Sequence, residues 1–122
     1  MADDNADADL RATIFDVYDK VGQKWHSRVV VALKDKRLRF SELKRELDGS
    51  TQRMLTRTLR SLERDGLVRR SVIESAQSHV DYELTELGQS SLRLIEHINA
   101  WITDHYQEIT LARKVFDARR EG

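Results

Sequence analysis

The chain has 122 residues, with no cysteine, no proline and a formal net charge of zero. Its length suits one compact domain, and the absence of cysteine excludes disulfides, thiolate metal sites and thiol redox chemistry. No apolar run approaches the roughly 18 residues of a membrane span, and the acidic N-terminus is unlike a signal peptide. We therefore expect a cytoplasmic protein that does not bind membranes.

The charges are distributed unevenly along the chain. From Lys24 to Arg70 there are 14 basic and 6 acidic residues, a net charge of +8, and the remainder carries −8. A basic segment produces a local field that attracts phosphate groups even when the total charge is zero. On composition alone, a solvated charged face explains this segment equally well.

The N-terminal part is predicted to be a tail followed by a helix. Residues 1–9 are acidic and carry no large apolar side chain after the first residue, which is typical of a flexible tail. From Leu10, apolar residues recur at Ile14 and Val17 with helical spacing. Gly22 is suited to end this helix.

Short elements are predicted in the next part of the chain. A second helix has Trp25 and Leu33 on its apolar face. Residues 38–40 are too few for more than a small strand, and a short helix is expected over 41–47. The Asp-Gly-Ser sequence at 48–50 is typical of a turn.

The helix after this turn has two contrasting faces. Thr51 is placed to cap a helix over residues 52–65, and Gly66 is placed to end it. Leucines at 55, 59 and 62 form an apolar stripe. The opposite face is polar and basic and consists of Gln52, Arg53, Thr56, Arg57, Arg60 and Arg64.

The remainder predicts a hairpin and a long helix. Residues 67–74 and 79–84 alternate as strands do, and Thr85 is placed to cap a helix that extends to about residue 118. The element order predicts a mainly α fold with a small β-hairpin: a winged helix-turn-helix of the three-helical-bundle type with additional N- and C-terminal helices. We expect one domain over residues 10–122, with the helix-turn-helix at about 40–65 and the wing at about 67–84.

Five segments match, in order, those of a known family. They are residues 22–25 (GQKW), 39–47 (RFSELKREL), 54–56 (MLT), 59–68 (LRSLERDGLV) and 82–88 (YELTELG). With these segments in register, the chain resembles the winged-helix regulators of the HxlR type, small bacterial DNA-binding proteins that dimerise. The resemblance implies that the helix after Ser50 is the recognition helix and that the first and last helices are dimerisation helices.

The chain departs from the family pattern at three places. Many members carry a cysteine where this chain has Ala12, so oxidant sensing through that thiol is excluded. The family often has proline where Gln52 stands. The loop at 74–79 lacks the proline and arginine frequent in relatives, which weakens the case for insertion of this wing into the minor groove.

DNA contacts are expected from the basic face of the recognition helix and from its surroundings. Arginine can bind guanine through two hydrogen bonds and glutamine can pair with adenine, so the first half of the helix is expected at base edges. Arg60 and Arg64 are expected to contact phosphates or to pair with nearby acids. Strand alternation sends Arg69 and Arg70 to opposite faces, so at most one of them can easily reach DNA. The predicted DNA-binding residues are Thr51, Gln52, Arg53, Thr56, Arg57, Arg60, Arg69, Arg70, Ser41 and Lys24.

A homodimer is expected because the terminal helices carry more apolar residues than a small core needs. The predicted interface residues are Leu10, Ile14, Val17, Leu94, Ile98, Trp101 and Ile102. A small-molecule effector, if one binds, is expected near Trp25, Tyr18 and Trp101.

Catalysis, cofactors and metal binding find no support in the sequence. There is no phosphate-binding glycine loop and no nucleophile motif, so an enzyme is not expected. His97 and His105 are too far apart on one helix to share an ion, and His26 is expected at the surface.

The leading hypothesis is a sequence-specific transcriptional regulator, a repressor or dual regulator, that binds double-stranded DNA as a homodimer at a pseudo-palindromic operator. The alternatives are a winged-helix module for protein–protein interaction and a non-specific architectural DNA-binding protein, because a fold does not fix a function.

Overall fold

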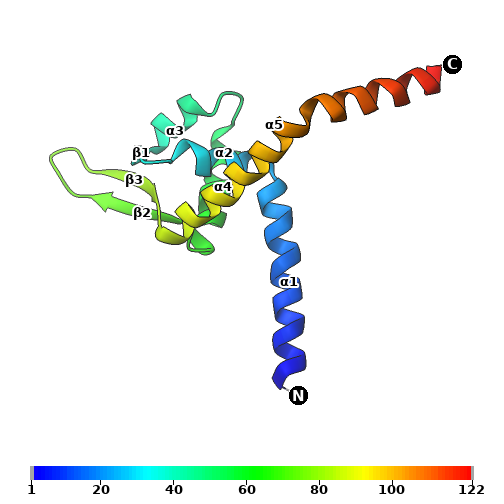
Figure 1. Cartoon of the computed structure of the whole chain (residues 1–122). Helices are drawn as coiled ribbons and strands as arrows, with labels where there is room; N and C mark the ends of the chain where they lie inside the picture. Colours follow the sequence, from blue (N-terminus) through cyan, green and yellow to red (C-terminus); the bar gives the residue numbers. More distant parts are fainter. Residues whose placement is uncertain (1, 122) are drawn as a thin grey trace. The chain divides into compact units, whose positions relative to one another are not determined.

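The computed structural model describes residues 2–121, with side chains described for residues 5–120. The elements follow in the order α1 (Ala2–Gly22), α2 (Lys24–Ala32), β1 (Leu38–Arg39), α3 (Phe40–Glu46), α4 (Gln52–Arg64), β2 (Val68–Ile73), β3 (His79–Leu84) and α5 (Glu86–Glu121) (Figure 1). The chain forms one compact unit that ends at Leu92, and the rest of α5, from Arg93, forms a second unit. The two units are described separately.

The core of the first unit is aliphatic and joins α2, α3, α4 and the sheet. Leu43 of α3 and Leu62 of α4 are fully buried, and Leu55 and Leu59 are almost so. The three α4 leucines are the stripe predicted from helical spacing. Each buried leucine contributes about 1.5–3 kcal/mol of hydrophobic stabilisation, so this stripe fixes α4 and leaves its opposite face to solvent.

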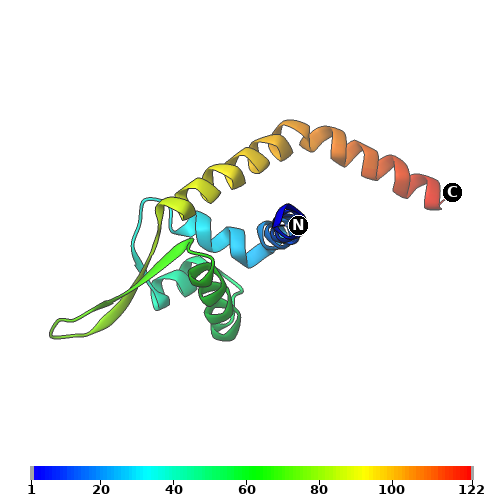
Figure 2. The ribbon, with the colours of Figure 1, turned by 90° about the horizontal axis from the view of Figure 1, so that it is seen from below.

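The sheet has three antiparallel strands in the order β1-β3-β2. The predicted hairpin is present as β2 and β3, which extend beyond the helices as a two-stranded wing (Figure 2). The short strand β1 pairs with β3 through Leu38 and Tyr82 and adds a third strand to the predicted hairpin. It also fixes the start of α3, because that helix begins at the residue after β1.

Both ends of α4 have the predicted caps. The Thr51 hydroxyl accepts a hydrogen bond from the Met54 N–H at 3.1 Å. At the other end, Gly66 has a positive φ of 78°. The N–H of Leu67 donates to the carbonyl of Leu62 at 2.9 Å, and the N–H of Gly66 donates to that of Glu63 at 3.0 Å. This is a Schellman ending, in which glycine accommodates the left-handed backbone.

Gly88 allows the first turn of α5 to pack closely against the backbone of Leu67, the residue before β2. A Cβ atom at position 88 would lie 2.0 Å from the carbonyl oxygen of Leu67. Thr85 caps this helix as predicted, because its hydroxyl accepts a hydrogen bond from the Gly88 N–H at 3.1 Å.

The terminal helices are longer than predicted. The helix α1 begins at Ala2, whereas a flexible tail was expected over residues 1–9. Alanine has the highest helix propensity, and aspartates near a helix N-terminus interact favourably with its dipole, so this segment can continue the helix. The helix α5 continues to Glu121, beyond the predicted end near residue 118.

Candidate nucleic-acid interface

The basic face of α4 is open to solvent in the described chain. Arg53, Arg57, Arg60 and Arg64 are all exposed, as are Thr51 and Gln52. Within residues 5–120, none of the four arginines has a salt bridge or a side-chain hydrogen-bond partner. Their guanidinium groups are therefore available to an external anion or base edge.

The first half of this face is held in place by local interactions. The hydroxyl of Thr56 donates to the carbonyl of Gln52 at 2.8 Å, so its proton is already used within the helix. Thr56 is half-buried and its oxygen lone pairs remain as acceptors.

Ser41, in the first turn of α3, is exposed. The Glu42 carboxylate accepts a hydrogen bond from the Arg39 N–H at 2.9 Å and stabilises the start of α3.

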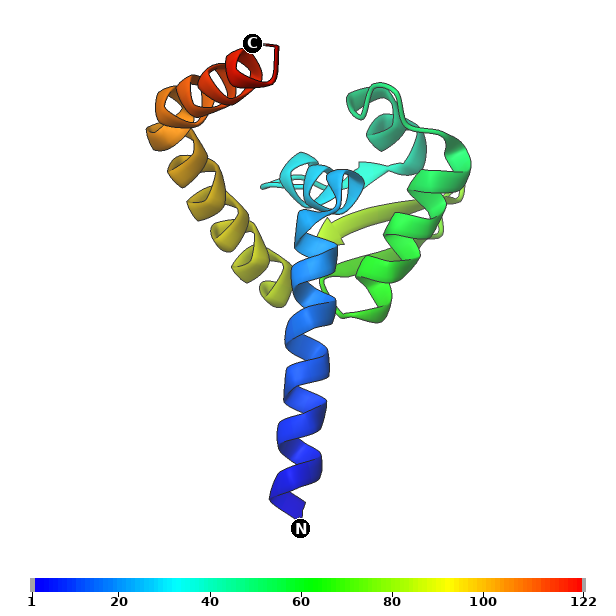
Figure 3. The same ribbon diagram turned by 90° about the vertical axis from the view of Figure 1, so that its right-hand side faces the viewer.

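A hollow of about 370 Å³ lies between α4 and the base of the wing. It is lined by Phe40, Thr56, Leu59, Arg60, Glu63, Arg70 and Tyr82. Figure 3 shows α4 running alongside the hairpin that carries Arg70. The structure therefore brings Arg70 to the side of the sheet that faces α4, next to Arg60.

Arg69 points to the other side of the sheet and is already paired. Its Nη1 lies 3.3 Å from Oε1 of Glu83, the residue opposite it on β3. The same carboxylate oxygen lies 3.1 Å from Nη2 of Arg37. The sequence predicted that one of the two wing arginines reaches DNA, and this geometry favours Arg70.

A second hollow, of about 430 Å³, lies between the start of α2 and α4. It is lined by Gln23, Lys24, Trp25, His26, Met54, Arg57, Thr58 and Ser61. Lys24 is exposed, and its Nζ lies 4.9 Å from the centre of the Trp25 ring. Lys24 and Arg57 of α4 thus line the same hollow. Tyr18, predicted to share an effector site with Trp25, does not line this hollow.

The prediction that His26 lies at the surface is wrong, because its side chain is only 4% exposed. Val29 and Val30 follow it on α2 at three and four residues, so helical periodicity places it on the same buried face as these valines. Burial is the main cause that lowers the pKa of His26, and the nearby positive charge of Lys20 lowers it further. The sequence analysis missed this residue because residue type alone does not decide the matter: histidine is intermediate between buried and exposed residue types.

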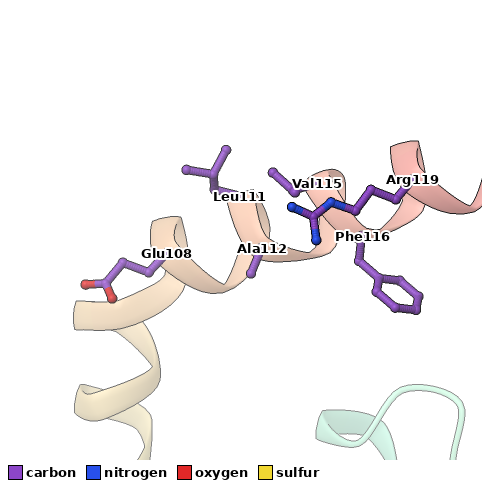
Figure 4. A pocket seen from close by; sticks show the side chains of 6 residues that line it. All are labelled: Glu108, Leu111, Ala112, Val115, Phe116 and Arg119. Atoms are coloured by element: carbon purple, nitrogen blue, oxygen red, sulfur yellow. The ribbon is translucent and has the colours of Figure 1, made fainter. Parts of the chain in front are cut away.

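The predicted dimer residues are exposed in the single chain. On α1 these are Leu10, Ile14 and Val17, and on α5 they are Leu94, Ile98, Trp101 and Ile102. Trp101 stacks on His105 of the same helix, with the ring centres 4.6 Å apart. Sequence reasoning missed three further exposed apolar residues near the end of α5: Leu111, Val115 and Phe116 (Figure 4). The homodimer itself stays a prediction.

The part of the chain that the structure describes has neither a cluster of metal ligands nor a helix that could span a membrane. Among residues 5–120, no three His, Cys, Asp or Glu side chains gather closely enough to hold a metal ion. The described helices also include none that is long and apolar enough to cross a bilayer.

Comparison with known proteins identifies the family. The profile of the HxlR-like helix-turn-helix family matches residues 20–110. The chain belongs to this family. An HTH-type transcriptional regulator of Methanothermobacter thermautotrophicus is 41% identical over 99 residues, which cover 81% of this chain and 76% of the relative. YdeP, an HTH-type transcriptional regulator of Bacillus subtilis, is 37% identical over 102 residues, which cover 81% and 80% of the two chains.

Solved structures agree with this HxlR-like assignment. A transcriptional regulator, YtfH of Salmonella typhimurium, superposes with a TM-score of 0.70 at 31% identity, over 81% of this chain and 88% of YtfH. The redox regulator HypR in its reduced form superposes with a TM-score of 0.71 at 32% identity, over 80% and 97% of the two chains. The predicted fold and family are confirmed: the chain is a helix-turn-helix transcriptional regulator and not an enzyme.

Proposed function

We propose that this HxlR-like regulator binds a pseudo-palindromic operator as a homodimer and acts as a repressor or dual regulator. The observation that carries the proposal is the exposed face of α4, where four arginines have no acidic partner within the described chain. A solvated face normally mixes both signs of charge. An unpaired row of guanidinium groups on the second helix of a helix-turn-helix instead favours a polyanion in contact with that helix.

The residues of this face have two expected roles. Arg53 and Arg57 are one helical turn apart, close to the Thr51 cap, where side chains of a recognition helix reach base edges in the major groove. Gln52 lies beside them. Arg60 and Arg70 line the same hollow at the base of the wing, which suits a backbone phosphate between them.

Lys24 and Ser41 complete the proposed footprint. Both are exposed and belong to the starts of α2 and α3, the two helices that precede α4 in the sequence. Their contacts would go to phosphates, which fix the orientation of the protein on the duplex without reading sequence. Such a regulator would act in the cytoplasm, in contact with the chromosome.

The proposed dimer supplies the second recognition helix. The exposed apolar residues of α1 and, separately, those of α5 are the surfaces that a second copy would cover. A two-fold axis repeats α4, and the operator should repeat its half-site with inverted orientation.

Selection of binding sites from a pool of random duplexes tests the proposal. We expect an enriched inverted repeat whose half-site centres are about one helical turn, ~34–36 Å, apart. Retention of DNA without an enriched sequence would favour an architectural DNA-binding protein. No retention of DNA at physiological salt would favour a protein-interaction module, and either result would refute the proposal.

A further inference from the structure

The helix α1 is attached to the rest of its unit through its last turn. Of its described side chains, from Asn5 onward, only those of Lys20 and Val21 are partly buried. The residues that carry the proposed dimer contacts, Leu10, Ile14 and Val17, lie further toward the N-terminus and are exposed. Side-chain packing of α1 against the rest of its unit is therefore limited to its last turn.

Lys20 makes a specific contact with the end of the recognition helix. Its Nζ lies 2.6 Å from Oδ2 of Asp65, the C-cap residue that follows α4, and 3.1 Å from Oδ2 of Asp16. The side chains of Lys20 and Asp65 are 16% and 30% exposed, so this pair is better shielded from water than an ordinary surface ion pair. The hydrogen bond that Lys20 donates to Asp65 is the largest cause that raises the pKa of Lys20.

Asp65 depends on this lysine because of its position. A carboxylate at a helix C-terminus lies near the negative end of the helix dipole, which is unfavourable. Lys20 supplies the compensating positive charge from another element. The ion pair therefore fixes the end of α4 to the last turn of α1. An exposed ion pair on a loop would not join two helices in this way.

We propose that Lys20 is a positioning residue for DNA recognition, which fixes the recognition helix relative to the dimerisation helix α1. The inference rests on the proposed dimer and on α4 as the reading helix. If α1 contacts a second copy, then the angle between α1 and α4 sets the separation of the two recognition helices. That separation must match the operator, in which each added base pair displaces a half-site by about 3.4 Å and rotates it. Lys20 thereby sets half-site spacing without touching DNA.

A measurement without DNA tests this directly. The chain has no cysteine, so Glu63→Cys on α4 provides one spin-label site per protomer. In the otherwise wild-type dimer, we expect a single narrow distance between the two labels. Lys20→Met and Asp65→Asn should each broaden or shift that distance. Lys20→Arg should keep it narrow, and the reversed pair Lys20→Glu with Asp65→Lys should restore it in part.

The matched control is another lysine–carboxylate pair. Lys36 Nζ lies 3.1 Å from Oε1 of Glu46, with the two side chains 51% and 40% exposed, and neither residue belongs to α1 or α4. Lys36→Met should leave the distance between the labels unchanged. An unchanged narrow distance in both Lys20→Met and Asp65→Asn would overturn the inference, as would equal broadening by Lys36→Met.

Binding to operators of altered spacing gives the functional readout. One base pair inserted between the half-sites should weaken operator binding by the wild type more than binding by Lys20→Met. The ratio of the affinities for the two spacings should therefore be about threefold to tenfold smaller in the variant. Equal discrimination in the two proteins would refute the role of Lys20 and leave DNA binding intact. If no distance between two spin labels is detected in the labelled, otherwise wild-type protein, the dimer is refuted, and this inference with it.

Discussion

Arg69 and Glu83 face each other across β2 and β3, with Nη1 of the arginine 3.3 Å from the carboxylate oxygen. This pair lies on the side of the sheet away from the hollow at α4, and strand alternation places the neighbouring Arg70 on the side that faces α4. The two consecutive arginines of the wing therefore have different environments, and we expect them to differ in function.

Replacement of Arg70 by alanine should weaken binding to operator and to random DNA alike. The lost interaction is with a phosphate, so the salt dependence, log Kd against log salt, should become shallower by about one unit. Arg69→Ala is the matched control and should change both affinities little. Titrations at several salt concentrations measure this, and equal losses from the two substitutions would contradict the assignment.

Substitution of charged residues into α5 tests the dimer. Ile98→Asp with Ile102→Asp places two carboxylates on an exposed apolar strip, and we expect monomers that lose operator binding. Asn99→Asp with Thr103→Asp adds the same charges to the adjacent polar positions and should leave the dimer intact. Sedimentation at micromolar concentration gives the result. A wild-type protein that is monomeric under these conditions would refute the dimer.

Two glycines should respond oppositely to alanine. Gly88→Ala creates a 2.0 Å contact with a backbone carbonyl, which flexible side chains cannot relieve, so we expect a loss of about 2–4 kcal/mol in the free energy of unfolding. Gly22→Ala meets no atom within 4 Å and should be neutral or stabilise α1 by up to about 1 kcal/mol. Urea unfolding compares them. Similar stabilities for the two variants would contradict the close contact between Gly88 and the Leu67 carbonyl.

The buried His26 should make stability depend on pH. Its pKa is lowered below the ordinary value of 6.5, mainly by burial and then by Lys20, so the unfolded chain binds a proton more readily than the folded one. The stabilising effect of the neutral ring is complete above pH 6.5 and is lost as the pH falls toward the folded-state pKa. Asp65 and Asp16 oppose the shift without reversing it.

Comparison of variants isolates this effect. As the pH falls below 6.5, the free energy of unfolding should decrease more steeply for the wild type than for His26→Leu. His97→Leu, at an exposed position on α5, should retain the wild-type slope. If His26→Leu keeps that slope as well, another group causes it.

Much of the fold follows from local sequence patterns. The leucine spacing at 55, 59 and 62, the Thr51 cap and Gly66 predict α4 and both of its ends, and strand alternation predicts the hairpin. The pairing of Lys20 with Asp65 depends on a contact between distant elements, and no local pattern predicts it. The spacing of His26 from Val29 and Val30 is that of one helical face, but its residue type does not show that this face is buried. The extent of α1 was missed because its first residues have no apolar periodicity, although alanine and aspartate suit a helix start.

The candidate site was predictable in composition but only partly in geometry. The basic residues on α4 follow from the helical period once Leu55 and Leu59 are placed in the core. Alternation placed Arg69 and Arg70 on opposite faces, but a sequence does not show which face of a hairpin meets α4. Packing of Tyr82 and Phe40 around the hollow decides that question in favour of Arg70.

The affinity of Arg53→Ala and Arg57→Ala for the selected operator and for a scrambled duplex tests the central claim most directly. If α4 reads base edges, each substitution should reduce operator binding by about 1–3 kcal/mol, relax the preference at particular base pairs, and affect the scrambled duplex less. Arg113→Ala, an exposed arginine near the end of α5, is the control and should behave as the wild type. Unchanged operator affinity in both variants, or equal losses on the two duplexes, would contradict sequence reading by these arginines.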